Sequence, residues 1–287
     1  MVITVKNVTK KYGKFKAVDN ISFEINDGEI IGLLGPNGAG KSTTMNILTG
    51  FIEPTEGEVI INGYNISKKP KKAKKCIGYM PEGVPLYKDM TVKEFVTYMA
   101  ELKGVKKEQI KESVDQAIQD TWLQNVRKVL IRNLSKGYKQ RVSMAGALVG
   151  NPEIIILDEP TAGLDVQGKI SLHHHIRMLK EQGKTIVLAS HDMAEVESLC
   201  DRIAILHEGR IAFCGTVEQL TEKIGKRYHL FIKTNQGDQN FVVDNIGDAL
   251  ITLLEEYRQK GITILDIQID RGTLEQHFIQ FVEGDGK

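Results

Sequence analysis

The stretch EIIGLLGPNGAGKS, residues 29–42, decides how this chain folds. Its first six residues form an apolar run typical of a buried β-strand. The next eight, GPNGAGKS, fit the pattern G-x-x-x-x-G-K-[ST], and a helix-like segment at residues 43–48 follows them directly. In this pattern glycines let backbone N–H groups surround phosphate oxygens at a helix N-terminus, where the helix dipole also favours an anion. The sequence therefore predicts a strand, a phosphate-binding loop and a helix.

The residues of this loop have distinct expected contacts. Lys41 should reach the β- and γ-phosphates of a nucleotide, and the Ser42 hydroxyl should bind Mg²⁺. We expect the following residues to bind the nucleotide: Gly35, Pro36, Asn37, Gly38, Ala39, Gly40, Lys41, Ser42 and Thr43. Kinases, GTPases and ATPases share such a loop, so the motif alone leaves the nucleotide and the reaction open.

Strand patterns alternate with helical patterns on both sides of the loop. Alternating or β-branched runs predict further strands at residues 2–7, 21–25, 153–158 and 185–189. Residues 91–150 instead have mainly helical spacing, and Thr91 with Glu94 forms a capping box. We therefore predict an α/β fold with a mainly parallel core sheet, antiparallel N-terminal strands and a helical subdomain at about residues 88–150.

The pattern changes again beyond about residue 221. Strand candidates and helix candidates lie at residues 228–233, 241–243, 246–260, 262–269 and 273–283. We predict that this part, residues 221–287, is a small C-terminal α+β appendage to a domain of residues 1–220.

Composition excludes several classes of protein. The chain has 287 residues, 41% of them hydrophobic and 26% charged, which is too apolar for a disordered protein. Lys and Arg number 38 against 37 Asp and Glu, a near-balance that argues against a dedicated nucleic-acid binder, so no nucleic-acid partner is expected. Cys76, Cys200 and Cys214 show no CxxC pairing and are expected to be reduced thiols.

Membrane and targeting signals give a further expectation. No stretch approaches the roughly 18 consecutive apolar residues of a membrane-spanning helix, and the first residues lack the apolar core of a signal peptide. We expect the chain to stay in the cytoplasm. If it works in transport, another polypeptide must build the path through the bilayer.

Two adjacent acids end the strand predicted at residues 153–158. Asp158 could hold the hydration shell of Mg²⁺, and Glu159 could polarise an attacking water. An ordinary exposed Asp-Glu-Pro turn explains the same residues equally well, so the pair alone leaves both interpretations open.

The order of further motifs resembles the ATP-binding cassette (ABC) family. The segment LSKGY at residues 134–138 precedes the strand that ends at Asp158, Gly163-Leu164-Asp165 follows it, and SHD at residues 190–192 closes the next strand. The resemblance covers nearly all of residues 1–220. It implies a P-loop NTPase cassette, an ATPase that uses ATP and Mg²⁺.

The resemblance also implies roles for single residues. Tyr12 matches the family's aromatic residue that stacks on adenine, and His191 matches the histidine that contacts the γ-phosphate. The implied catalytic residues are Glu159, His191 and Lys41. The implied metal-binding residues are Ser42, Glu82 and Asp158, although the family has glutamine at the position of Glu82.

The segment LSKGY matches the family's signature LSGGQ. In the family the serine and glycine of this segment bind the γ-phosphate of the nucleotide held by a partner protomer. Ser135 and Gly137 keep these positions, with Asp165 as a further implied nucleotide contact, whereas Lys136 and Tyr138 replace the first glycine and the glutamine. ATP would therefore be clamped between two chains, in a homodimer or in a heterodimer with a second cassette subunit.

The two departures from the family pattern are familiar in exporters whose membrane permease is a separate polypeptide. The resemblance thus implies a subunit that powers an exporter from the cytoplasmic face of the cell membrane. Val84, Leu86, Tyr87 and Met90 would offer apolar groups to a permease helix, although core packing explains each of them equally well. The alternatives are a soluble family ATPase acting on DNA or the ribosome, and an importer subunit.

Two runs of like residues are interpreted as surface features. Lys68 to Lys75 contains six lysines in eight residues and is expected to be a solvated charged stretch. His173-His174-His175 is expected to lie on an exposed helix face, where three consecutive residues diverge too far to share one metal ion.

Overall fold

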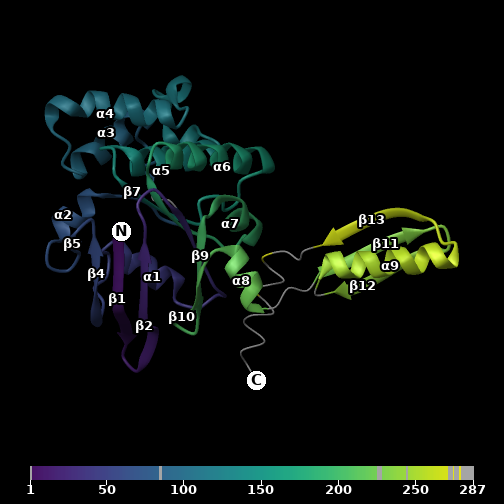
Figure 1. Cartoon of the computed structure of the whole chain (residues 1–287). Coiled ribbons are helices and arrows are strands. Elements are labelled where there is room, and N and C mark those ends of the chain that lie inside the picture. The colour runs from purple at the N-terminus through teal and green to yellow at the C-terminus, as the bar shows by residue number, and fades with distance from the viewer. Residues whose placement is uncertain are drawn as a thin grey trace. The chain divides into compact units, whose positions relative to one another are not determined.

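The structure is a computed structural model that describes residues 2–83, 86–224, 228–243 and 245–270, together with Leu274 and Phe278. The chain divides into two compact units, Met1–Cys214 and Gly215–Lys287 (Figure 1). The predicted α/β class is confirmed, with a mainly parallel core sheet, an antiparallel N-terminal sheet, a helical part and a small C-terminal sheet.

Two sheets organise the first unit. The core sheet has the order β10-β9-β3-β8-β7-β6 and is built from β3 (Ile30–Leu34), β6 (Ile77–Met80), β7 (Ile154–Asp158), β8 (Thr185–Ala189), β9 (Arg202–His207) and β10 (Arg210–Gly215). Its pairings from β9 across to β6 are parallel. The second sheet is antiparallel, with β2 (Phe15–Ile25), β1 (Ile3–Tyr12), β4 (Glu56–Ile61) and β5 (Tyr64–Asn65) in that order.

Burial explains why β3 and β8 are continuous apolar runs. Every residue of β3 and β8 is buried, as expected for parallel strands covered on both faces. The helix α1 (Lys41–Leu48) contacts β2 of one sheet and β7 of the other, and its Met45 is fully buried in the shared core. The phosphate-loop helix is therefore anchored to both sheets.

The parallel register brings three loops to one edge of the core sheet. The strand β8 pairs with β3 on one side and with β7 on the other. The carboxyl ends of neighbouring parallel strands lie at the same edge, which is where open α/β sheets bind their ligands. The residues that follow β3, β7 and β8, namely Gly35, Glu159 and Ser190, are thus brought together.

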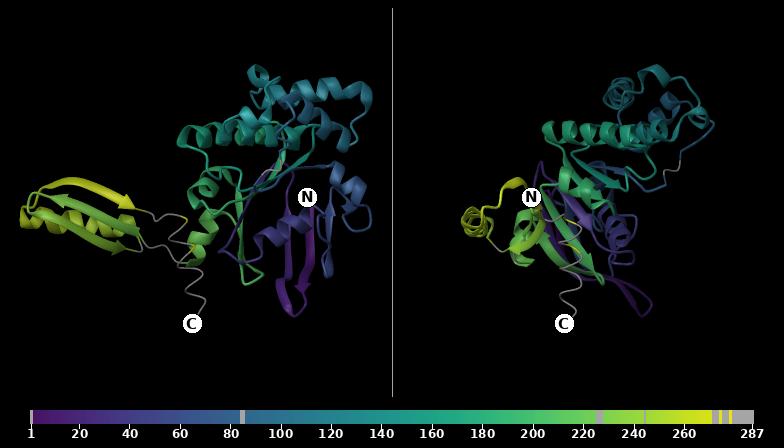
Figure 2. Two further views of the ribbon diagram at one scale, coloured as in Figure 1. Left: turned by 180° about the vertical axis from the view of Figure 1, so that it is seen from behind. Right: turned by 90° about the vertical axis from the view of Figure 1, so that its right-hand side faces the viewer.

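A helical part at residues 92–148 has a core of its own, with Val92, Phe95 and Val96 among its buried residues. It contains α3 (Val92–Leu102), α4 (Lys107–Asp120), α5 (Lys136–Leu148) and two short 3₁₀ turns, Gln124–Val126 and Ile131–Asn133. The predicted capping box starts α3, because Thr91 accepts from the Glu94 amide and donates its own amide to the Glu94 carboxylate. Figure 2 shows the helices α3 and α4 gathered at one end of the first unit.

The remaining helices of the first unit connect these parts. They are α2 (Pro70–Lys75), α6 (Val166–Glu181) and α7 (Met193–Leu199). The three cysteines are free thiols and partly buried, as predicted. Within the part of the chain that the structure describes, each helix is too short or too polar to cross a bilayer.

The second unit is a small α+β fold. Its strands β11 (Tyr228–Thr234), β12 (Gly237–Val243) and β13 (Ile264–Asp270) form an antiparallel sheet in the order β12-β11-β13. Leu253 and Tyr257 of the helix α9 (Ile246–Lys260) share one apolar core with Leu230 and Ile232. A further helix, α8 (Val217–Ile224), precedes the sheet. The helix expected at residues 273–283 lies outside the described residues, apart from Leu274 and Phe278.

The close contact between β6 and α5 generates a stability prediction. A Cβ on Gly78 would lie 2.3 Å from the carbonyl oxygen of Ala147 and 2.8 Å from Cγ of Pro152, so strand and helix would have to separate. We expect Gly78→Ala to lower the free energy of unfolding by about 1–3 kcal/mol. Urea unfolding, monitored by the fluorescence of the single tryptophan Trp122, measures the free energy of unfolding of the first unit, which contains Gly78.

Gly137→Ala in α5 is the matched control. A Cβ at this residue meets only Leu164, at 3.9 Å, so the added methyl fits and the helix gains from it. Its unfolding midpoint should equal or exceed that of the parent. Equal midpoints for both variants would contradict the tight packing of β6 on α5.

Candidate functional site

The loops at the sheet edge line one cavity of about 540 Å³. Most of the residues predicted from the phosphate loop, the paired acids and the histidine reach this cavity. Its lining consists of Tyr12, Phe15, Ala17, Asn37, Gly38, Gly40, Lys41, Ser42, Thr43, Glu82, Asp158, Glu159 and His191. Gly35, Pro36 and Ala39 belong to the same loop but do not line the cavity, and Ala39 packs in the core.

The backbone of the loop explains its glycines. Gly40 has φ +102°, and a Cβ there would lie 2.5 Å from the carbonyl oxygen of Ala17, so only glycine fits. The helix α1 begins at the next residue, and no side chain caps it. The positive end of α1 is therefore open toward the cavity, as an anion site requires.

Lys41 is the cation of this cavity. Its Nζ donates to the carbonyl oxygens of Gly35 at 2.5 Å and Pro36 at 3.1 Å. Burial lowers its pKa, while the nearby carboxylates of Glu159 and Asp158 act in the opposite direction. The ammonium is thus held by its own loop, beside the place where the loop leaves space for an anion.

The paired acids face the cavity rather than forming an exposed turn. The Glu159 side chain is only 12% exposed. Burial, followed by repulsion from Glu82 and Glu159, raises the pKa of Asp158 to about 6. Three carboxylates therefore share a partly desolvated space in which Lys41 is the nearby cation.

Glu159 is held in a strained backbone conformation. Its φ is +48°, a left-handed value that costs a non-glycine residue of the order of 1 kcal/mol. Its amide donates to the carbonyl oxygen of Ala189 at 2.9 Å, which continues the pairing of β7 with β8 past the end of the strand. This conformation brings a Glu159 carboxylate oxygen within 2.7 Å of Nδ1 of His191.

The sequence analysis missed two lining residues, Phe15 and Ala17. Tyr12 pairs directly with Phe15 across a two-residue turn in which Gly13 has φ +59°. Both aromatic rings are more than half exposed beside the phosphate loop. A Tyr-Gly-x-Phe sequence between two strand patterns is the hairpin signal that would have identified this second ring.

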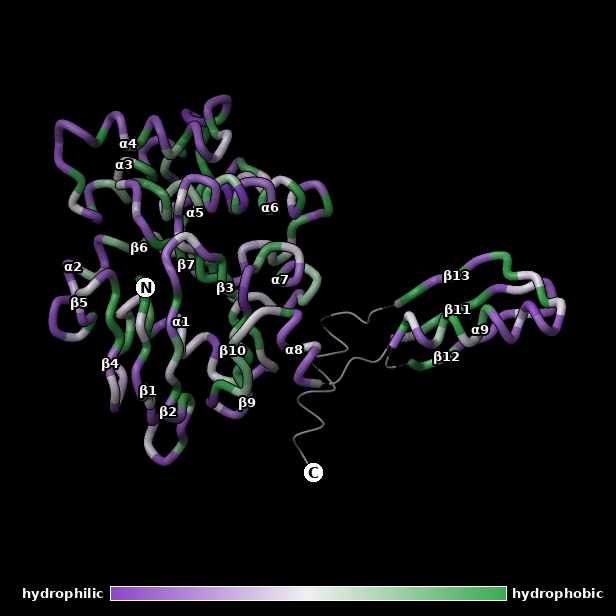
Figure 3. Tube along the Cα trace, viewed as in Figure 1, coloured by the Kyte–Doolittle hydropathy of each residue, from purple (hydrophilic) through white to green (hydrophobic). Residues whose placement is uncertain are grey.

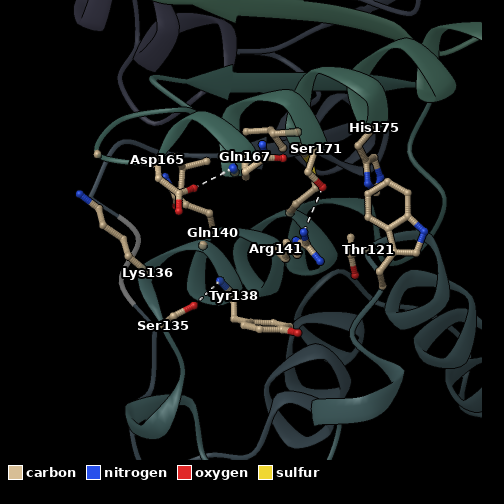
Figure 4. A pocket seen from close by; sticks show the side chains of 17 residues that line it. Thr121, Ser135, Lys136, Tyr138, Gln140, Arg141, Asp165, Gln167, Ser171 and His175 are labelled. Carbon is tan, nitrogen blue, oxygen red and sulfur yellow. Dashed lines mark hydrogen bonds between the residues drawn. The ribbon is translucent and has the colours of Figure 1, made fainter.

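A second cavity, of about 450 Å³, holds the other predicted residues (Figure 4). Ser135 and Asp165 both line it and both begin helices. Ser135 Oγ accepts from the Tyr138 amide at the start of α5, and Asp165 accepts from the Gly168 amide at the start of α6. Ser135, Gly137 and Asp165 are therefore not brought together with Lys41 within one chain.

Lys136 lines one side of this second cavity. A Cβ on Gly163 would lie 1.8 Å from Nζ of Lys136, so the lysine chain lies directly against that glycine. Gly163 has φ +67°, a left-handed value that favours glycine there. Figure 4 shows Lys136 on the same side of the cavity as Asp165.

The histidine run is only partly exposed, which corrects the expectation: His174 is exposed, His173 is half-buried and His175 is buried. His173 bonds a Glu195 carboxylate oxygen at 3.1 Å, His174 stacks on Trp122, and His175 is only 5% exposed. The Trp122 ring meets His175 edge-on, with a centroid distance of 5.1 Å. His174 and His175 therefore pack α6 against Trp122 at the end of α4, whereas His173 joins α6 to α7.

A third, apolar cleft of about 580 Å³ lies beside α3. Leu86 and Tyr87 line it, whereas Met90 packs against the core of the helical part, and Val84 lies outside the described residues. The other apolar or aromatic lining residues are Phe51, Ile77, Tyr79, Pro81, Phe95, Tyr98, Met99 and Leu102. Phe51 is 79% exposed and Leu102 is 62% exposed at this cleft. Such an apolar, partly exposed groove is typical of a helix-binding surface.

Burial of His175 generates a pH prediction. Desolvation, assisted by the charges of Arg141 and His174, lowers the pKa of His175 from 6.5 to about 4. The unfolded chain therefore binds the extra proton between pH 6.5 and pH 4, so the stability is complete above pH 6.5 and is lost as the pH falls. We expect His175→Gln to remove about 2 kcal/mol of the stability lost between pH 7 and pH 5.

Urea unfolding at both pH values, followed by circular dichroism, measures this difference. His174→Gln is the control, because His174 stacks on the same Trp122 ring as its buried neighbour but is itself exposed. A parent and a His175→Gln variant that lose equal stability between pH 7 and pH 5 would contradict a buried neutral imidazole.

Comparison with known proteins agrees with this geometry. Residues 18–162 match the family model described as ABC transporter. The chain is 43% identical over 222 residues to an uncharacterised ABC transporter ATP-binding protein of Methanocaldococcus jannaschii, covering 77% of this chain and 80% of the relative. It is 31% identical to the linearmycin resistance ATP-binding protein LnrL of Bacillus subtilis, over 97% of each chain.

A solved relative extends the match to structure. A dimeric ATP-binding cassette, in a post-hydrolysis state with ADP and Pi bound, superposes with a TM-score of 0.67 at 30% identity. The match covers 75% of this chain and 98% of the cassette. Sequence, fold and cavity therefore agree, and the chain belongs to the ABC transporter family as an ATP-binding subunit that hydrolyses ATP to drive transport.

Proposed function

We propose that this chain powers an exporter, through closure of a cassette dimer around ATP and coupling to a separate membrane permease. The observation that carries the proposal is the single cavity that joins Lys41 and Asp158 to the hydrogen-bonded pair of Glu159 and His191. The full-length similarity to a resistance protein supports export rather than import. Residues 1–220 serve as the cassette domain, with its helical subdomain at about residues 88–150, and residues 221–287 serve as an accessory domain.

Different residues of the first cavity bind the nucleotide and assist its hydrolysis. The loop amides of residues 35–43, the start of α1 and Lys41 hold the phosphates, and Tyr12 stacks on the adenine base. Glu159 accepts a proton from the attacking water at a carboxylate oxygen. His191 fixes that carboxylate through its Nδ1 and contacts the γ-phosphate.

The donor set of this cavity suits Mg²⁺. Ser42, Glu82 and Asp158 offer only oxygen atoms, and Mg²⁺ is typically bound by one or two carboxylates, phosphate oxygens and water rather than by a protein cage. The raised pKa of Asp158 reflects burial first and then repulsion from Glu82 and Glu159, and a cation would relieve that repulsion. When bound, Mg²⁺ would neutralise charge on the β- and γ-phosphates.

Two chains are needed to complete the site. Ser135, Gly137 and Asp165 lie in a cavity different from that of Lys41, so within one chain they do not meet the same nucleotide. Facing a second cassette, Ser135 and Gly137 at the start of α5 bind the γ-phosphate held by the partner. Either a second copy or a related cassette subunit supplies that partner.

Coupling uses the apolar cleft beside α3. A cytoplasmic helix of the permease lies in this cleft against Leu86, Tyr87 and the exposed Phe51. Because β6 leads directly toward Glu82, movement at the nucleotide reaches the cleft through a short segment. The subunit therefore works peripherally, on the cytoplasmic face of the cell membrane.

Glu159→Gln separates binding from hydrolysis. The amide oxygen of glutamine still accepts from His191, but the side chain no longer takes up a proton at neutral pH. We expect the ATPase rate to fall by about 10²–10⁴-fold while ATP affinity changes little. Phosphate release and equilibrium binding of ATP measure the two quantities.

The exposed Glu181, at the end of α6, supplies the control for this test. Glu181→Gln should keep the parent rate. A Glu159→Gln variant that hydrolyses ATP as fast as the control would refute the assignment of Glu159 as the base.

Mixing two inactive variants tests the shared site. Lys41→Ala removes the phosphate cation, and Ser135→Asp keeps the helix cap while placing an anion against the γ-phosphate. Each variant alone should be inactive, and the mixture should recover about a quarter of the parent rate, because half of the randomly paired dimers hold one intact site.

The dependence of the parent's ATPase rate on protein concentration tests the same dimer closure independently. Its ATPase rate should rise more than linearly with protein concentration, since only the dimer is complete. No recovery on mixing, together with a rate proportional to concentration from a proven monomer, would overturn the shared site.

A further inference from the structure

A run of six lysines at residues 68–75 precedes β6. All six of its lysines, Lys68, Lys69, Lys71, Lys72, Lys74 and Lys75, are exposed. No ion pair to any of them exists among the residues that the structure describes. Figure 3 shows the helix α2 in the hydrophilic colour. The expectation of a charged, exposed stretch holds, and six lysines without an ion pair in the described residues form a concentrated positive surface.

The fold holds this surface in place. The helix α2 is anchored by Ala73, which is fully buried, and by contacts with β5 and β6. The Asn65 side chain accepts from the amides of Ser67 and Lys68, which fixes the approach to the helix. The lysine side chains therefore project from an ordered turn of backbone rather than from a free chain.

The lysine run is continuous with the apolar cleft. Lys74 lines that cleft together with Phe51 and Leu102, so positive charge and exposed apolar groups border each other. The proposed function places a permease helix in the cleft, and a permease is surrounded by the bilayer. The lysine surface then lies at the edge of the interface that faces the membrane.

We propose that Lys68 to Lys75 forms a docking surface for anionic lipid headgroups, an inference that rests on the proposed function for its orientation. The run contains no arginine. Arginine is enriched and lysine depleted in protein interfaces, because the planar guanidinium makes defined paired contacts. Flexible, strongly hydrated lysines instead suit a diffuse negative surface, and clusters of four to eight basic residues beside a membrane bind anionic lipid.

The overall charge supports a local effect. The chain has a formal net charge of only +1, so uniform attraction of the whole protein to a negative membrane is weak. The six lysines concentrate their charge within eight residues, a span shorter than two Debye lengths at physiological salt. The surface therefore orients the subunit on the membrane instead of merely attracting it.

Vesicle flotation of the whole chain tests this proposal. The probes are vesicles of phosphatidylcholine alone and vesicles with about 30% phosphatidylglycerol. The test variant replaces Lys68, Lys69, Lys71 and Lys75 by glutamine. It keeps Lys74, which lines the cleft, and Lys72, which lies over the Tyr64 ring.

The matched control has the same change of charge elsewhere. It replaces four exposed lysines around α4, namely Lys106, Lys107, Lys111 and Lys128, by glutamine. The parent and the control should bind phosphatidylglycerol vesicles and lose binding as salt rises, whereas the test variant should bind at least about tenfold more weakly. None of the three should bind phosphatidylcholine alone.

Two results would overturn the proposal. Equal loss in the test and control variants would assign the effect to net charge rather than to this surface. If the parent chain bound neither type of vesicle but bound poly-glutamate through the same lysines, the surface would be assigned to an acidic protein segment. ATPase activity, measured in parallel, should be the same in both variants as in the parent. If the parent itself showed no ATPase activity, that result would contradict the proposed function, while vesicle binding would still test the lipid proposal.

Discussion

The structure depends on the parallel pairing of β8 between β3 and β7. This register puts three carboxyl-terminal loops at one edge, so that a phosphate loop, a pair of acids and a histidine share one cavity. Its energetic origin is the burial of continuous apolar strands on both faces. The hydrogen bond from the Glu159 amide to Ala189 extends the same pairing into the site and holds Glu159 in its left-handed conformation.

The two cavities separate the predicted nucleotide contacts of this chain into two groups. The first cavity gathers the phosphate loop and the acids, while the second gathers two helix starts, at Ser135 and Asp165. The Ser135 hydroxyl and the Asp165 carboxylate are both used as helix caps, so the local stability of α5 and α6 is tied to the residues proposed to face a partner. A substitution at Ser135 or Asp165 therefore changes the stability of its helix as well as the cavity.

The apolar cleft and the lysine run border each other at Lys74, and the cleft extends from there past β6 to α3. Apolar groups are exposed at the cleft at a cost in solvation that a bound helix would remove. The neighbouring lysines repel one another without counter-charges in the described part of the chain, and an anionic surface would relieve that repulsion. Each feature is more favourable in a complex than in the isolated subunit.

The sequence by itself determined the local elements, because glycine turns, caps and apolar periodicity act over few residues. It gave the loop at residues 35–42, the capping box at Thr91 and the strands β7 and β8. Only the tertiary structure decided which distant residues meet. The burial of His175 and the separation of Ser135 from Lys41 depend on strand order and on packing between elements far apart in the chain. Such long-range contacts leave no periodic signal, since each is fixed by the register of the sheet as a whole.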